Sequence, residues 1–290
     1  MKHIIFLVAF VCAITFSACE KEVPEISNQE ICPNDEIWYS SADNNIIKPT
    51  NTDAFDANIV SNTYENGKGI IKFDSEIKAI GHHAFYKCSN LTSVIIPESI
   101  TSIGYISFGE CDNLLSFTIP DNVTDIDHYA FMGCHMLKSI TIPDSVINIH
   151  SGAFSECSQL KAFYGKFATT DNRCLIVNDR LVAFAPYGLT YYTIPDNVKS
   201  IIEVSFTSCK NLSSITIPAN VTWIGWCTFL GCSNLKYVYC EPTTPPAGNS
   251  NMFDFINEAA KIYVPIGSAE AYKAADFWKN YADLIEEKEM

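Results

Sequence analysis

Apolar residues recur at a fixed interval through the middle of the chain. Four columns of residues repeat every 23 positions, each with one interval of 52, which corresponds to a 29-residue unit followed by an ordinary one. The columns are Phe85, Phe108, Phe131, Phe154, Phe206 and Phe229; Cys88, Cys111, Cys134, Cys157, Cys209 and Cys232; Leu91, Leu114, Leu137, Leu160, Leu212 and Leu235; and Pro97, Pro120, Pro143, Pro195 and Pro218. This self-similarity predicts a solenoid, in which each unit buries its apolar face against its neighbours.

Each unit contains one predicted strand, between the leucine and proline columns. Val94 and Ile96 have the period-two spacing of a half-buried strand, and Pro97 ends it. The corresponding pairs are Ile71/Phe73, Val94/Ile96, Phe117/Ile119, Ile140/Ile142, Phe163/Gly165, Tyr192/Ile194, Ile215/Ile217, Val238/Cys240 and Ile262/Val264. Stacked at the spacing of neighbouring strands, they predict a parallel, concave sheet of about nine rungs.

The remaining part of each unit is too short for a crossover helix. Residues 84–88 therefore predict only a short helical turn on the convex side. Gly81, Gly104 and Gly225 share a column, and we expect positive φ there because glycine tolerates it. The long unit, at about residues 163–191, predicts a hairpin with a tight turn at Asn178-Asp179.

Both ends of a solenoid must be capped. We expect an N-terminal β cap over residues 36–69, with a hairpin turn at Asn66-Gly67, followed by the repeats over 70–241. Residues 242–290 predict the last rung and a helical cap, with Ser268 as a plausible N-cap. The expected packing residues of that helix are Tyr272, Trp278, Tyr281 and Ile285.

The N-terminus carries a predicted export signal. A basic start, a short apolar run and small residues over positions 1–18 are typical of a signal peptide, and the run is too short for a spanning helix. Cys19, after Phe16-Ser17-Ala18, resembles the acylated cysteine of bacterial lipoproteins. Acyl chains on Cys19 would anchor the chain stably. Residues 19–35 then form a lipidated tether, and we expect no other contact with the membrane.

The repeat unit reads Ile-x-x-Ile-Gly-x-x-Ala-Phe-x-x-Cys-x-x-Leu-x-x-Val-x-Ile-Pro, as in residues 77–97. Together with the 29-residue hairpin unit and the tryptophan-bearing terminal segment, it resembles the BspA-like leucine-rich repeat family over about residues 36–290. The resemblance implies a leucine-rich repeat solenoid of the α/β class, rich in β structure. It also implies a surface or secreted bacterial protein with a binding role. Some members act as adhesins for host matrix proteins or for other bacteria.

Charge and cysteine content narrow the classes of partner. The chain has 33 acidic and 19 basic residues, which argues against a nucleic-acid partner because phosphate binding needs clustered Lys and Arg.

The column cysteines are expected to pack as buried free thiols, since parallel Cβ vectors disfavour disulfides. The redox states of Cys32, Cys174, Cys227 and Cys240 stay open. We expect no cofactor and no metal, because there is no Cys-x-x-Cys pair and the histidines His82, His83 and His128 are scattered over predicted loops.

One column has the residue types of a catalytic triad. Asp112, His135 and Ser158 are 23 residues apart and should stack on successive turns. The same column carries Ser89, Lys210 and Ser233 elsewhere, which is typical of a variable solvent position. No nucleophile elbow accompanies Ser158, so we do not expect an enzyme.

The outward positions of the predicted sheet carry the candidate binding residues. The C-terminal half of this face presents Tyr164, Tyr191, Tyr237, Tyr239 and Tyr263. Tyrosine is common at binding hot spots, although it also simply suits exposed strand positions. The sequence therefore predicts a non-catalytic lipoprotein of the outer membrane or cell surface that binds a protein on another surface. A glycan ligand is the alternative.

Overall fold

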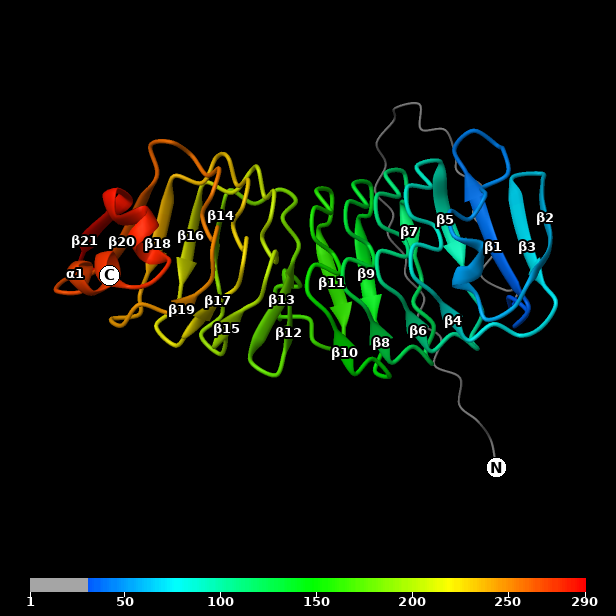
Figure 1. Cartoon of the computed structure of the whole chain (residues 1–290), viewed down its shortest axis with the longest axis horizontal. Coiled ribbons are helices and arrows are strands. Elements are labelled where there is room, and N and C mark those ends of the chain that lie inside the picture. Colours follow the sequence, from blue (N-terminus) through cyan, green and yellow to red (C-terminus); the bar gives the residue numbers. More distant parts are fainter. Residues whose placement is uncertain (1–30) are drawn as a thin grey trace.

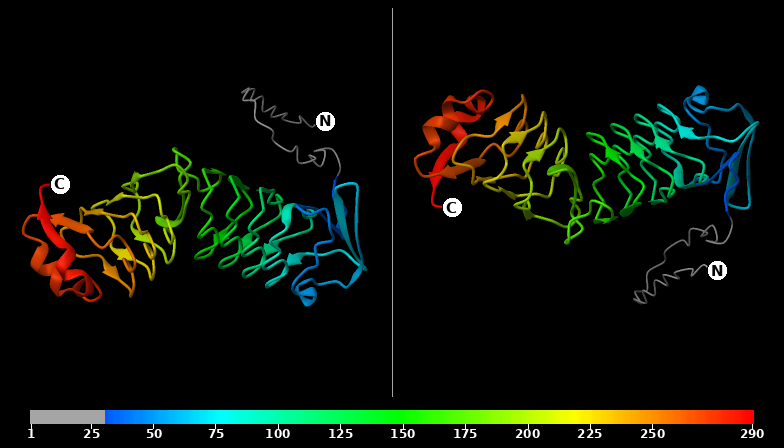
Figure 2. Two further views of the ribbon diagram at one scale, coloured as in Figure 1. Left: turned by 90° about the horizontal axis from the view of Figure 1, so that it is seen from above. Right: turned by 90° about the horizontal axis from the view of Figure 1, so that it is seen from below.

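The structure is a computed structural model that describes residues 31–290. The predicted signal peptide, Cys19 and most of the tether lie outside the described residues. The described chain forms an elongated stack of turns, and from Leu91 onward successive turns follow one another toward the C-terminus (Figures 1 and 2). Among residues 31–290, no helix has the length and apolar character needed to cross a bilayer. The predicted leucine-rich repeat solenoid is confirmed.

One long side of the stack carries the repeat strands that the sequence predicted, and the unpredicted strand β21 (Ile285–Lys288) extends it. Parallel pairing joins residues one repeat apart, as between Ser93 and Ser116 or between Ile215 and Val238. Hydrogen bonding divides this side into three sheets. Its strands are β5 (Leu91–Ile95), β7 (Ser116–Phe117), β9 (Ser139–Ile142), β11 (Ala162–Gly165), β14 (Tyr191–Thr193), β16 (Ser214–Ile217), β18 (Tyr237–Cys240), β20 (Lys261–Pro265) and β21 (Ile285–Lys288).

A second row of short strands lines the other side, where the sequence predicted the hairpin of the long unit but only short helical turns in the other units. Its first sheet contains β4 (Ala79–Ile80), β6 (Ser102–Ile103), β8 (Asp125–Ile126) and β10 (Asn148–Ile149). Its second contains β15 (Ser200–Ile201), β17 (Trp223–Ile224) and β19 (Ala247–Gly248), extended by the hairpin of β12 (Cys174–Val177) and β13 (Arg180–Phe184). Figure 1 shows the two rows on opposite edges of the stack. Each repeat unit therefore contributes two strands.

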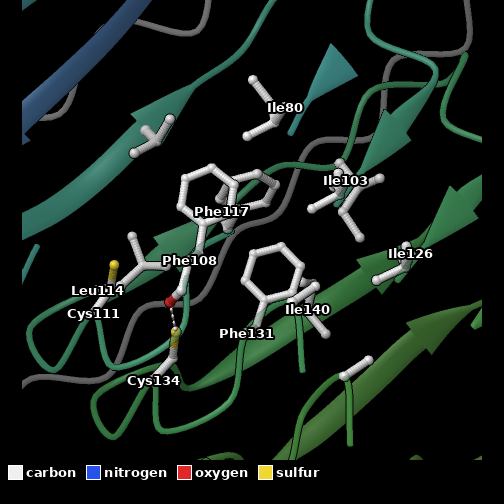
Figure 3. Close-up of a cluster of buried hydrophobic side chains, with 14 of the residues drawn as sticks. Ile80, Ile103, Phe108, Cys111, Leu114, Phe117, Ile126, Phe131, Cys134 and Ile140 are labelled. Atoms are coloured by element: carbon white, nitrogen blue, oxygen red, sulfur yellow. Dashed lines mark hydrogen bonds between the residues drawn. The ribbon is translucent and has the colours of Figure 1, made fainter. Parts of the chain in front are cut away.

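The core lies between the two rows of strands. Phenylalanine rings of successive turns stack face to face, with centroids 5.4 Å apart for Phe108 and Phe131 and an interplanar angle of 6°. Figure 3 shows these rings between Ile103 and Ile126 of the short strands and Phe117 and Ile140 of the long side. The column cysteines complete each layer: Cys111, Cys134, Cys157, Cys209 and Cys232 are buried and Cys88 is half-buried. All ten cysteines of the described residues are free thiols in the structure, as predicted for the column.

The glycine column does not have the predicted conformation. Positive φ falls instead two positions later, at His83, Ile106, Tyr129, Gly152, Val204 and Cys227. Gly81, Gly104 and Gly225 are needed because neighbouring turns approach closely. A Cβ on Gly81 would lie 2.3 Å from the Ala54 carbonyl oxygen, and one on Gly225 would lie 2.4 Å from the Glu203 nitrogen. Glycine here makes room for adjacent backbone.

The N-terminal cap is a β structure, but its order differs from the prediction. It contains β1 (Glu36–Ser41), a short 3-10 helix (Thr52–Ala54), β2 (Ile59–Glu65) and β3 (Lys68–Phe73). Strand β1 lies between β3 and β5 and is antiparallel to both. The pair Ile71/Phe73 is therefore not the direct neighbour of Val94, and the parallel array begins at β5. Antiparallel β1 thus covers the edge of the first repeat.

The C-terminal cap is less helical than predicted. The segment forms α1 (Ala269–Ala274), the 3-10 segment η2 (Trp278–Leu284) and then β21, which pairs with β20 in parallel. Ser268 stands at the N-cap position but makes no side-chain capping hydrogen bond. The four expected packing residues, Tyr272, Trp278, Tyr281 and Ile285, are all buried.

Candidate binding surface on the long side of the solenoid

Three of the predicted tyrosines form one cluster on the last strands of the long side. Tyr239 of β18 is paired in register with Tyr263 of β20, and their ring centroids lie 5.3 Å apart at 27°. Tyr237 stacks on the same Tyr263 ring from the diagonal position, at 6.3 Å and 14°. The rings stack along the solenoid, so Tyr237 and Tyr239 each contact Tyr263 through one ring face. We call Tyr237, Tyr239 and Tyr263 the tyrosine cluster.

A lysine from the terminal strand joins the tyrosine cluster. The Lys288 ammonium lies 4.6 Å from the Tyr263 ring centroid and 4.8 Å from that of Tyr239, which is within cation–π range. Beside it, Lys261 of β20 forms an ion pair with Glu286 of β21. The sequence alone did not indicate Glu286 and Lys288, because the terminal segment was expected to be a helical cap. No periodic signal marks them, since β21 follows the last repeat.

A shallow pocket borders the cluster. Its volume is about 260 Å³, and it is lined by Thr216, Tyr239, Glu241, Glu289 and Met290. Two carboxylates therefore stand next to an aromatic edge and a hydroxyl group. This arrangement suits a cationic group that also carries an apolar stem, such as a lysine or arginine side chain.

The other two predicted tyrosines lie apart from the cluster. Tyr191 of β14 is 74% exposed, and it is separated from Tyr237 by Ser214 of β16. Tyr164 of β11, which is 45% exposed, pairs with Thr141 of β9 in a different sheet. Tyr164 and Tyr191 were expected to belong to one aromatic surface, but β11 and β14 are not paired. The hairpin unit separates them.

The structure does bring part of the Asp112, His135 and Ser158 column together. His135 Nε2 lies 3.9 Å from Asp112 Oδ1, and His135 Nδ1 lies 3.0 Å from the backbone oxygen of Glu156. A carbonyl oxygen accepts a hydrogen bond, so Nδ1 is the donor and Nε2 faces the carboxylate. Neither ring nitrogen is then directed at Ser158, as a triad requires.

The histidines are not all scattered, which corrects the expectation for His128. Its ring lies 4.6 Å from that of His150, centroid to centroid, and its Nδ1 lies 2.9 Å from Asp127 Oδ1. His82 and His83 instead contact the ring of Tyr105.

The repeated turns, their paired strands and the phenylalanine–cysteine core define a leucine-rich repeat solenoid. Comparison of the sequence with protein families gives a match to the BspA type leucine rich repeat region, in six copies over residues 57–173 and 181–275. Since the match covers more than half of the chain, the chain belongs to the BspA-type leucine-rich repeat family. No curated protein sequence matched the chain.

Several solved structures are similar to this chain. A leucine rich cell surface protein from Faecalibacterium prausnitzii shares 22% identity, with 74% of this chain and 77% of that chain covered and a TM-score of 0.42. A leucine-rich repeat protein from Eubacterium ventriosum shares 22% identity, with 66% and 64% covered and a TM-score of 0.46. One from Bacteroides ovatus shares 21% identity, with 72% and 70% covered and a TM-score of 0.36.

Proposed function

We propose that this chain is a non-catalytic, lipid-anchored surface protein that binds a protein partner through the tyrosine cluster. The single observation that carries the proposal is the group of Tyr237, Tyr239, Tyr263 and Lys288 on an exposed sheet side. Aromatic side chains with polar tips contribute large contact area at little entropic cost, which is why they dominate binding hot spots.

The geometry of the cluster favours a protein over a glycan. Sugar rings stack on aromatic faces, but the faces of Tyr239 and Tyr263 contact each other and Lys288. The cluster instead borders, through Tyr239, the pocket that holds the carboxylates of Glu241 and Glu289. A basic side chain of a protein partner would complement these carboxylates, and the net charge of −14 would attract a basic surface.

Glycan binding is the second candidate, and the exposure of Tyr191 favours it. With 74% of its surface exposed, this ring is the one of the five with the most area for a sugar. A glycan site would then be centred on β14, away from the cluster. The two candidate functions therefore predict that substitutions at different residues weaken binding.

The test begins with host-protein and glycan arrays, which identify a partner for the later measurements. Tyr237→Ala with Tyr263→Ala should weaken binding of the captured protein by about 2 kcal/mol or more, which is roughly thirtyfold. The matched control is Ser116→Ala with Ser139→Ala, two exposed strand positions on the same side of the solenoid. Loss of a glycan signal with Tyr191→Ala alone would favour the second candidate. Equal protein binding by both double variants would refute the tyrosine cluster as the contact site.

The anchor is a separate part of the proposal and has its own test. We propose export through the signal of residues 1–18 and acylation of Cys19, which places the solenoid on the outer membrane or cell surface. Cys19→Ser should abolish acylation and move the protein from the detergent phase to the aqueous phase. An unacylated wild-type chain with an intact N-terminus would contradict this part and leave the binding proposal standing.

A further inference from the structure

A group of metal-ligating side chains lies on the side of the solenoid that carries the short strands. Asp127 and His128 follow β8, and His150 follows β10 one repeat later. One donor atom from each of these three residues lies within 4.8 Å of the others. Asp125 Oδ1 stands 3.3 Å from His150 Nε2. Two imidazoles and two carboxylates thus converge from neighbouring turns.

We propose that Asp127, His128 and His150 bind a divalent first-row transition-metal ion of the Zn²⁺ type. Imidazole nitrogen together with carboxylate oxygen is a donor set that such ions prefer, whereas Mg²⁺ and Ca²⁺ prefer oxygen alone. Three protein donors leave one position of a tetrahedral ion for water.

The backbone holds these residues in register. The His150 N–H donates to the Ile126 oxygen at 2.9 Å, and the Asp127 N–H donates to the Ile103 oxygen at 2.9 Å. The ligand-bearing turns are therefore fixed relative to each other. The side chains keep freedom, since 46% of His128, 38% of His150 and 29% of Asp127 are exposed. Donors of a tetrahedral site lie about 3.3 Å apart, which small side-chain rotations reach from the observed spacing.

Asp125 has the position of a supporting carboxylate. Its contact with one ring nitrogen of His150 would orient the imidazole and leave the other nitrogen to bind the ion. Carboxylates that hydrogen-bond a ligating histidine fix its tautomer and raise its basicity.

The repeat itself does not require these residues. Asp127 and His150 occupy the column that is glycine in three other units, at Gly81, Gly104 and Gly225. The fold is thus built equally well without a carboxylate or an imidazole there. The departures from the repeat occur in consecutive units, so their side chains meet. If these side chains served only the fold, metal-ligating atoms from two neighbouring turns would not need to meet.

The experiment uses the purified full chain without a histidine tag, stripped of metal and kept reduced. Titration with Zn²⁺ against a chromogenic chelator should show one site per chain. His150→Ala and His128→Ala should each lower the affinity at least tenfold, and Asp125→Asn should lower it by about 10–100-fold. His82→Ala, a histidine outside the cluster, is the matched control and should leave the affinity unchanged. Circular dichroism should show that all four variants keep the fold.

Co²⁺ spectra separate this site from the thiols. Binding to nitrogen and oxygen gives d–d bands without the thiolate-to-cobalt charge-transfer bands that cysteine ligation produces. No stoichiometric binding, thiolate bands, or an equal loss of affinity in the His82→Ala control would each overturn the proposal.

Discussion

Cysteine in the repeat combines small size with a hydrogen-bond donor. The thiols of Cys111, Cys134 and Cys157 each donate to the backbone oxygen of a phenylalanine in the preceding turn, at 3.1, 3.2 and 3.2 Å. Cys232 does the same toward Phe206 at 3.1 Å. Figure 3 shows the bond from Cys134 to Phe108. This buried position is small, and a backbone carbonyl there needs a hydrogen-bond donor. Cysteine suits it because its side chain is small and apolar and its thiol is a weak donor.

Removing one thiol should therefore cost packing and a hydrogen bond together. We expect Cys134→Ala to lower the free energy of unfolding by about 1–2 kcal/mol, measured by urea denaturation under reducing conditions. Cys88→Ala, in the same column but half-buried, should cost less. Equal losses for the two variants would show that burial of the thiol does not determine its contribution.

Because the thiols are buried, the free energy of unfolding should fall as the pH rises into the alkaline range. Burial raises the pKa of Cys157 from 9.0 to about 12, and raises the pKa values of Cys111 and Cys134 in the same direction. Below about pH 9 both folded and unfolded chains hold these protons, so pH has no effect through them. Above it the unfolded chain ionises first, so stability falls as pH rises toward the folded pKa.

We expect the urea midpoint to be flat from about pH 7 to 8.5 and to fall between about pH 9 and 11. Cys157→Ala should make this fall shallower without removing it, because burial also raises the pKa values of Tyr192, Tyr272 and Tyr281. An equally steep fall in the variant would mean that Cys157 ionises equally easily in both states.

At the scale of elements, strand β21 organises the C-terminal cap. The Glu287 carboxylate accepts hydrogen bonds from the N–H groups of Gly267 and Ala269, at 2.9 and 3.1 Å. These donors lie at the start of α1, where a helix leaves N–H groups unpaired. The capping oxygen thus comes from a strand 18 residues further along the chain and not from Ser268.

Glu287→Ala should consequently destabilise the cap by about 1 kcal/mol, the usual cost of losing an N-cap acceptor. Ser268→Ala, one residue before the helix, should change stability much less. Thermal unfolding of the two variants side by side measures the difference. A larger loss of stability for Ser268→Ala would show that Ser268 caps the helix, as the sequence predicted.

An element could be predicted from the sequence when its residues form a local or repeated pattern. The columns identified the long strands, the core and the hairpin, because each repeat presents the same pattern again. The two-residue strands such as Ala79–Ile80 are too short to show alternation. The place of β1 between β3 and β5 follows from long-range pairing that no local pattern encodes. β21 reads Ile-Glu-Glu-Lys, which favours helix, and becomes a strand by pairing with β20.

Some residues of the candidate sites could likewise be predicted from the sequence, and others could not. The repeat indicated that the tyrosines of β18 and β20 point outward, but Lys288 could not be found on an unpredicted strand. The 23-residue period does place Asp127 beside His150, so that signal was present in the sequence. It was missed because His128 and His150 do not share a column.

At the scale of the whole molecule, the long unit separates two cores. Phe85, Phe108, Phe131 and Phe154 stack in one series, and Phe184, Phe206, Phe229 and Phe253 in another. Within residues 31–290, no continuous strand pairing joins the sheets of the two halves, and only an isolated antiparallel bridge links Ala168 to Leu175 of β12. The junction also holds a cavity of about 340 Å³, lined on one side by His135, Glu156 and Ser158 and on the other by Pro186 and residues 208–211. Polar contacts across the junction include the Ser151 hydroxyl, which donates to Glu203 at 2.9 Å, and the Tyr187 N–H, which donates to the Leu160 oxygen at 3.0 Å.

Coupling between the halves should therefore be weaker than coupling within each half. In a solenoid, stability is close to a sum of unit and nearest-neighbour contributions, so a weak interface limits how far a defect spreads. Phe229→Ala should remove about 3–5 kcal/mol from the C-terminal core. Hydrogen exchange followed by mass spectrometry should then show faster exchange in β16, β18 and β20, while β5 to β9 keep wild-type protection.

Phe131→Ala is the mirror variant, because it removes the same ring from the N-terminal stack. It should expose β5 to β9 to exchange and leave β16 to β20 protected. The pair controls for the size of the deletion, which is identical, so only the position of the defect differs. Uniform loss of protection in both variants would mean that the two cores unfold as one unit. The packing of the hairpin across the junction would then couple them as strongly as strand pairing does.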